Sequence, residues 1–155
     1  MSTPVAWWAQ DALDAARTEA DRAFPLETGG VLLGWRATTT EVVITDLVGP
    51  GPRAQHHRVW FRPDAEWQQE QIDARYALSG RTVTYLGDWH THPNGSPLLS
   101  RKDLRTLRRI SRHADARIGQ PVMAVVAGGP KWLLAVRQLR RPGGRRTEPL
   151  TVTAY

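Results

Sequence analysis

The stretch TVTYLGDWHTHPNGSPLLSRKD, residues 82–103, contains a strand pattern, a turn pattern and a helix start in direct succession. Its first part, residues 82–89, is rich in β-branched and aromatic residues, which favours a β-strand. Residues 93–97 contain the proline, asparagine and glycine of a rigid turn. Ser100 then begins a helix that we expect to continue to about His113. The three signals in succession predict one strand–turn–helix unit.

His90 and His92 stand at the end of the predicted strand, where they favour a metal site. Side chains alternate between the two faces of a strand, so these two imidazoles share one face. Asp103, in the first turn of the following helix, is the candidate third ligand. However, Ser100 and Asp103 also match the Ser-x-x-acid pattern of a capping box, which stabilises a helix start without a metal. The residues alone leave both interpretations open, and the combination at one spacing favours the metal site.

A hydrolytic metal site also needs a carboxylate that moves protons to and from the reacting atoms. Glu27 is the best candidate, because it precedes glycines that let another chain approach closely, in the stretch Glu-Thr-Gly-Gly. The structural alternative for Glu27 is a solvated turn residue. Asp88 competes for the role, since it lies two residues before His90 and therefore on the same strand face.

The composition predicts a single globular domain and excludes sites that depend on cysteine. A chain of 155 residues suits a single domain spanning residues 1–155, and 41% hydrophobic with 23% charged residues is typical of a globular protein. The absence of cysteine excludes thiolate zinc sites, iron–sulfur clusters and a cysteine nucleophile. No apolar run approaches the roughly 20 residues of a membrane span, and the N-terminus lacks a basic signal region. We therefore expect a cytoplasmic protein without a membrane partner.

The net charge of +6 raises the question of an acidic partner. Arginine carries nearly all of the positive charge, and it gathers on the predicted helix after Ser100 and in RQLRRPGGRR, residues 137–146. The simplest interpretation is a solvated helix face and a charged turn. A nucleic-acid-binding module is the alternative, but no recognised nucleic-acid motif supports it, so nucleic acid is the less favoured partner.

The remaining segments predict an α/β protein with a mixed sheet. Residues 6–24 have helical periodicity, and a second helix follows Pro63 and ends near Gly80. The apolar run at 31–33 and the segment 41–48 predict a hairpin, and 49–58 has the composition of a loop. Further strands are expected at 122–128, at 131–139 and near 150–154.

The pattern Glu27-Thr-Gly-Gly, Gly-Asp-Trp-His90-Thr-His92-Pro and Ser100-x-x-Asp103 resembles the JAMM motif of the MPN-type metalloproteases. The resemblance covers the motif in full and, in element order, most of the chain. It implies a cytidine-deaminase-like three-layer α/β/α sandwich with a mixed central sheet. It also implies one Zn2+ per chain held by His90, His92 and Asp103, with Glu27 as general base and acid. Ser100 is implied as a donor to the tetrahedral oxyanion.

The compact length resembles the stand-alone bacterial members of this family, which act on ubiquitin-like or sulfur-carrier proteins that end in Gly-Gly. This resemblance implies a zinc-dependent isopeptidase or peptidase that cleaves after the Gly-Gly tail, removing a ubiquitin-like protein from its target or processing its precursor. Some of these members belong to antiphage systems. We expect a narrow groove beside Gly29 and Gly30 to bind the tail, so that Gly30→Val would abolish turnover and leave zinc bound.

Three alternative functions compete with this one. A hydrolase of an adduct between a sulfur-carrier protein and an amino acid uses the same site, and the sequence does not separate it from the isopeptidase. A DNA-repair-associated relative shares the His-x-His-Pro-x-Gly loop, whereas Glu-Thr-Gly-Gly favours the peptidase branch. A zinc nucleobase deaminase requires cysteine ligands and is excluded.

Overall fold

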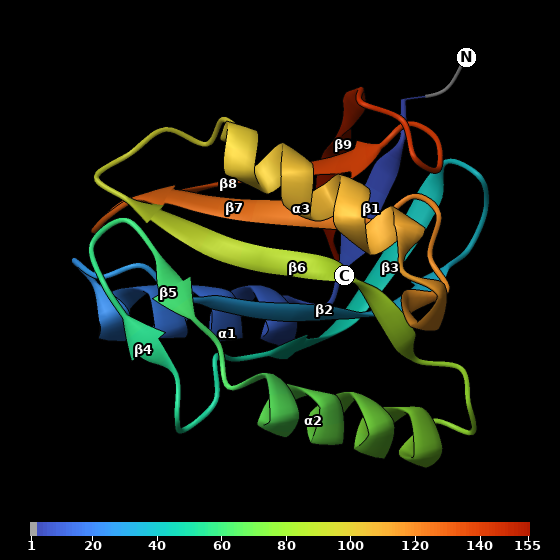
Figure 1. Ribbon diagram of the computed structural model, residues 1–155, viewed down its shortest axis with the longest axis horizontal. Helices are drawn as coiled ribbons and strands as arrows, with labels where there is room; N and C mark the ends of the chain where they lie inside the picture. The colour runs from blue at the N-terminus through green and yellow to red at the C-terminus, as the bar shows by residue number, and fades with distance from the viewer. Residues whose placement is uncertain (1–2) are drawn as a thin grey trace.

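The computed structural model describes residues 3–155, and its central feature is a mixed sheet that closes on itself (Figure 1). The strands follow the spatial order β1 (Val5–Trp8), β3 (Glu41–Val48), β2 (Gly29–Arg36), β6 (Thr84–Pro93), β7 (Val122–Gly128), β8 (Trp132–Leu139) and β9 (Thr147–Ala154). Closure comes from parallel pairing between β9 and β1. The α/β class and the mixed sheet are therefore confirmed, but the sheet is a closed barrel instead of the open middle layer of the expected sandwich.

In the described part of the chain, three α-helices pack against this barrel: α1 (Gln10–Ala23), α2 (Ala65–Leu78) and α3 (Arg101–Arg112). A short 3₁₀ turn, η1 (Ala114–Ala116), follows α3. In Figure 1, β6 runs between α2 and α3. None of the helices within residues 3–155 combines the length and the apolar character needed to cross a bilayer.

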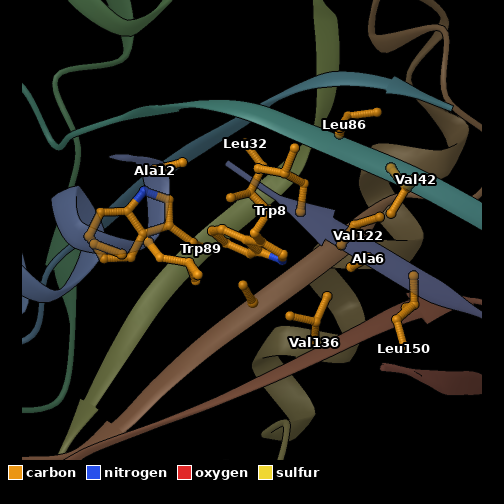
Figure 2. Packing of buried hydrophobic residues seen from close by; sticks show 14 of the residues in the cluster. Ala6, Trp8, Ala12, Leu32, Val42, Leu86, Trp89, Val122, Val136 and Leu150 are labelled. Atoms are coloured by element: carbon orange, nitrogen blue, oxygen red, sulfur yellow. The ribbon is translucent and has the colours of Figure 1, made fainter. Parts of the chain in front are cut away.

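The two faces of β2 are buried against different helices, which explains its continuous apolar run. Leu32 belongs to the main core, together with the alanines of α1 and with Trp8 and Trp89. Figure 2 shows these two indoles within that cluster. Val31 and Leu33 point to the other face and pack against the α2 residues of a second cluster, Trp67 and Ile72. The predicted buried strand and its hairpin partner β3 are both confirmed.

The N-terminal prediction was wrong in one respect, because residues 5–8 form β1 and the helix begins only at Gln10. Along β1, Ala6 and Trp8 are fully buried while Trp7 is partly exposed, which is the alternation of a strand. This strand completes the barrel by pairing with β3 on one side and β9 on the other. The last strand is also longer than expected, since β9 begins at Thr147.

The segment predicted as a loop at 49–58 contains part of a small hairpin. Its strands β4 (Gln55–His56) and β5 (Phe61–Arg62) pair with each other and lie outside the barrel (Figure 1). The β4–β5 hairpin is followed by α2, whose N-cap Asp64 accepts a hydrogen bond from the backbone N–H of Trp67. The predicted helix after Pro63 is thus confirmed.

Candidate metal centre

His90 and His92 lie on one face of β6, as the alternation of the strand predicts. Their Nε2 atoms are 2.9 Å apart. Asp103, in the first turn of α3, completes the group: Oδ1 lies 3.2 Å from His90 Nε2 and Oδ2 lies 3.4 Å from His92 Nε2. Asp103 and His90 are only 8% and 7% exposed. The turn between β6 and α3 therefore brings three side chains together that lie in two different elements.

The donor atoms of these three residues fit a tetrahedral metal ion. Bonds of about 2.0–2.1 Å to zinc place neighbouring ligand atoms about 3.3 Å apart. Each imidazole lies at about this distance from one oxygen of the Asp103 carboxylate, and one ligand atom from each of the three residues lies within 4.8 Å of the others. His92 Nδ1 lies 2.8 Å from the Ser96 carbonyl oxygen. Because a carbonyl only accepts, Nδ1 carries a proton. A neutral His92 would then offer the lone pair of Nε2 to a metal ion, whereas a protonated His92 donates from Nε2 to Asp103.

The capping box and the metal-binding group coexist in the same residues. Ser100 Oγ accepts from the Asp103 N–H at 3.1 Å, and the Ser100 N–H donates to Asp103 Oδ2 at 2.8 Å. The cap thereby fixes the orientation of the carboxylate that faces the histidines. Burial raises the pKa of Asp103, but hydrogen bonds from His90 and His92 outweigh it and hold the pKa well below its usual range. The hydrogen bond to Asp103 in turn raises the pKa of His92.

Glu27 lines the same cavity as the three metal-site residues. Burial raises the pKa of Glu27, while the nearby His90 and His92 lower it. A raised pKa makes the Glu27 carboxylate a stronger proton acceptor than an ordinary glutamate. The competing Asp88 also lines the cavity, but its Oδ1 accepts a hydrogen bond from the Tyr85 hydroxyl at 2.8 Å. Asp88 is thus engaged by Tyr85, and the role of Glu27 in proton transfer stays a prediction.

Gly29 and Gly30 are required by the packing between strands. A Cβ at Gly30 would lie 1.8 Å from the Val48 carbonyl oxygen, and one at Gly29 would lie 2.3 Å from the Trp89 carbonyl oxygen. The Val48 oxygen also accepts from Trp89 Nε1, so it cannot move freely. A substrate-binding role for the two glycines stays a prediction. The expectation that Gly30→Val would leave zinc bound also stays a prediction, and the clash with the Val48 carbonyl oxygen shows that β2 or β3 would have to shift in that variant.

The sequence interpretation missed how the β4–β5 hairpin contacts Glu27. The Glu27 N–H donates to the His57 carbonyl oxygen at 2.7 Å, and His56 Nδ1 lies 3.0 Å from the Glu27 carbonyl oxygen. The His57 ring stacks on Trp60 with a centroid distance of 3.8 Å. The two neighbouring histidines therefore contact different partners, His56 the Glu27 carbonyl and His57 the Trp60 ring. Contacts between segments this far apart leave no periodic signal in a sequence.

Comparisons with known proteins agree with this geometry. The family model described as prokaryotic homologs of the JAB domain matches residues 9–140. The chain is 44% identical over 131 residues to the probable metalloprotease y4qB of Sinorhizobium fredii, covering 82% of this chain and 79% of that relative. It is also 29% identical over 105 residues to a CD-NTase/cGAS isopeptidase of Enterobacter hormaechei, covering 67% of this chain and 57% of that relative.

A solved structure extends the comparison to the fold. The solution structure of a Desulfitobacterium hafniense protein superposes with a TM-score of 0.69 over 97% of this chain and 93% of that one, at 14% identity. This likeness concerns the fold alone. The family match, in contrast, covers most of the chain and includes Glu27, both histidines, Ser100 and Asp103. The chain therefore belongs to the prokaryotic homologues of the JAB domain and is an enzyme of the JAMM metalloprotease type.

Proposed function

We propose that this enzyme is a zinc-dependent isopeptidase or peptidase that hydrolyses the bond after the Gly-Gly tail of a ubiquitin-like protein. The observation that carries the proposal is the convergence of His90, His92 and Asp103 in the cavity that Glu27 also lines. The isopeptidase names of several relatives favour this class of substrate. The alternative substrate, an adduct of a sulfur-carrier protein with an amino acid, fits the same chemistry.

In this proposal different residues bind the metal, transfer the proton and stabilise the oxyanion. Two imidazole nitrogens and one carboxylate oxygen would hold Zn2+, which when bound polarises the scissile carbonyl and lowers the pKa of water. Glu27 accepts the proton of the attacking water and returns it to the leaving amine. In the capping box Ser100 Oγ accepts a hydrogen bond, so its own hydrogen is available to donate to the developing oxyanion.

The test combines metal analysis with cleavage of Gly-Gly-tailed fusion proteins. We expect about one zinc per wild-type chain, in keeping with one three-ligand site. His92→Ala should lose the zinc, whereas Glu27→Gln should keep it and lose turnover. Fusions with an isopeptide-linked lysine and carrier-protein adducts, compared at equal concentration, distinguish the two substrate classes. An active Glu27→Gln variant, or cleavage that survives full removal of the metal, would contradict the proposal.

A second candidate function concerns the surface of α3. A shallow cleft is lined entirely by basic residues and histidine: Arg105, Arg108, Arg109, Arg112 and His113. Within residues 3–155, none of these arginines is among the ion pairs. Like charges one helical turn apart repel each other, and this cost favours an anionic partner such as the phosphates of nucleic acid.

This candidate is tested by oligonucleotide binding at several salt concentrations. Binding through phosphates should weaken steeply with salt and should be lost in the triple variant Arg105→Gln/Arg108→Gln/Arg112→Gln. Glu27→Gln should bind as the wild type does, because it lies outside α3 and keeps the three metal-site residues. Equal binding by the triple variant would exclude this surface as a nucleic-acid site.

A further inference from the structure

We propose that His56 is a positioning residue that holds Glu27 in place for proton transfer, through a hydrogen bond from its Nδ1–H to the Glu27 carbonyl oxygen. The inference deepens the proposed function and rests on it for the role of Glu27. On this proposal the β4–β5 hairpin acts on the reaction by holding the backbone of Glu27, without contacting the substrate.

Glu27 lies just outside the barrel, where the sheet no longer fixes its backbone. The pairing of β2 with β6 begins at Gly29, opposite His90. Thr28 is still held, since its N–H donates to Thr91 Oγ1 at 3.0 Å and its carbonyl accepts from the Thr91 N–H at 2.8 Å. Glu27 is the next residue outward, so its orientation depends on contacts other than the strand ladder.

The β4–β5 hairpin supplies those contacts. Both backbone polar groups of Glu27 bond to consecutive hairpin residues, its N–H to the His57 carbonyl at 2.7 Å and its carbonyl to His56 Nδ1 at 3.0 Å. The first bond is made by backbone atoms and survives any side-chain change at His57. The bond from His56 Nδ1 to the Glu27 carbonyl depends on a side chain, so a substitution of His56 removes it. His56 is therefore the residue through which the hairpin contact can be tested.

Packing holds the His56 ring in the orientation that this hydrogen bond requires. The ring is half-buried and stacks on Phe61 across the hairpin, with an interplanar angle of 13°. Phe61 in turn lies over Gly29, where an added Cβ would come within 2.7 Å of its ring. The hairpin is therefore seated directly on the start of β2. Because the Glu27 carbonyl only accepts, His56 carries its proton on Nδ1.

A set of four single variants tests the proposal, each measured for kcat, KM and zinc content. His56→Asn places an amide N–H at the same number of bonds from Cα as Nδ1, whereas His56→Gln places it one bond further out. We expect His56→Ala and His56→Gln to lower kcat by about 10- to 100-fold, as a misplaced catalytic group does, with KM and zinc content unchanged. His56→Asn should retain most of the activity. His57→Ala is the matched control, because it removes a neighbouring imidazole and keeps the backbone bond to Glu27.

An additional measurement separates this inference from the proposed function. Hydrogen exchange of the Glu27 amide measures, without any substrate, how firmly the hairpin is bound to Glu27. The exchange should be faster in His56→Ala and remain slow in His56→Asn. If Gly-Gly substrates are not cleaved by the wild type but the exchange pattern holds, the proposed substrate fails and the positioning contact stands. A rise in KM alone, or an Asn variant as impaired as the Ala variant, would overturn the role of His56.

Discussion

Ser100 and Asp103 serve both as a helix cap and as part of the candidate site. The two hydrogen bonds of the cap tie the Asp103 carboxylate to the first turn of α3, and that carboxylate faces both histidines. The Ser-x-x-Asp pattern therefore fits both a helix cap and a metal site. The two roles are compatible because α3 begins beside the end of β6. The sequence alone predicts this part of the site, because His90, His92, Ser100 and Asp103 lie within 14 consecutive residues, on either side of one turn. Glu27 lies far from them in the sequence.

Replacing Ser100 separates these two roles. Ser100→Ala removes the side-chain acceptor for the Asp103 N–H and should lower the free energy of unfolding by about 1 kcal/mol. It should also lower kcat, because the proposed oxyanion donor is lost. Ser100→Thr retains a hydroxyl and should recover most of the stability. Denaturant unfolding and steady-state kinetics give the two readouts, and an Ala variant as stable as the wild type would argue against a stabilising cap.

Gly30 provides a prediction about packing with a neighbouring glycine as its control. Gly30→Ala forces a methyl group to within 1.8 Å of the Val48 carbonyl oxygen and should cost about 1–3 kcal/mol of stability through strain. At Gly49 an added Cβ meets nothing within 4 Å, so Gly49→Ala should change stability by less than about 0.5 kcal/mol. Thermal unfolding of both variants measures the difference. Equal melting temperatures would mean that β2 and β3 separate at little cost.

At the scale of elements, local patterns predicted β6, α2 and α3 because each has a self-contained signal. Turn residues precede α3, and β-branched and aromatic residues fill β6. The same local argument failed at β1, where residues 6–8, next to a run of good helix formers, were assigned to the helix. Tertiary pairing with β3 and β9 overrides helix propensity there.

The N-terminus of α2 yields a prediction about pH. Asp64 is buried and accepts hydrogen bonds from Arg53 Nε at 3.0 Å and from the Trp67 N–H at 3.3 Å. The bond from Arg53 lowers the pKa of Asp64. A lowered pKa means that the carboxylate stabilises the fold above its unfolded pKa of about 3.9, and that this contribution is lost as the pH falls through the lower folded value.

Asp64→Asn isolates that charge, because asparagine is also a good N-cap. The variant should melt a few degrees below the wild type at neutral pH, with the effect limited by the exposure of Arg53 to solvent. The gap should narrow as the pH is lowered below the unfolded pKa. Melting curves collected across this range provide the test, and a gap that is independent of pH would show that the ion pair contributes nothing.

At the scale of the whole molecule, closure of the barrel was beyond local sequence patterns. Parallel pairing of β1 with β9 joins residues from the two ends of the described chain, and nothing in either segment specifies its partner. The closed sheet nonetheless leaves the site where the motif predicted it, because the site depends on β6, on the turn after it and on α3. The placement of Glu27 depends on β2 alongside β6 and on the β4–β5 hairpin.

The attachment of α3 to the barrel leads to a prediction about metal removal. Only Asp103 and Leu107 of α3 are buried, whereas α1 buries Ala12, Leu13, Ala16, Ala20 and Ala23. A metal ion bound by His90, His92 and Asp103 would therefore add a large share of the interactions that hold α3 against β6. α1, which packs into the main core, gains nothing directly from the metal.

Chelation should consequently loosen one part of the molecule and leave the rest unchanged. Hydrogen exchange measured by mass spectrometry should speed up in residues 94–112 after metal removal, while residues 10–23 keep their protection. His92→Ala should reproduce this pattern without a chelator, and restored metal should reverse it only in the wild type. Faster exchange in α1 as well would mean that the metal stabilises the whole fold. No change in α3 would mean that Leu107 and the capping box suffice to hold the helix, and the metal would then have no part in anchoring it.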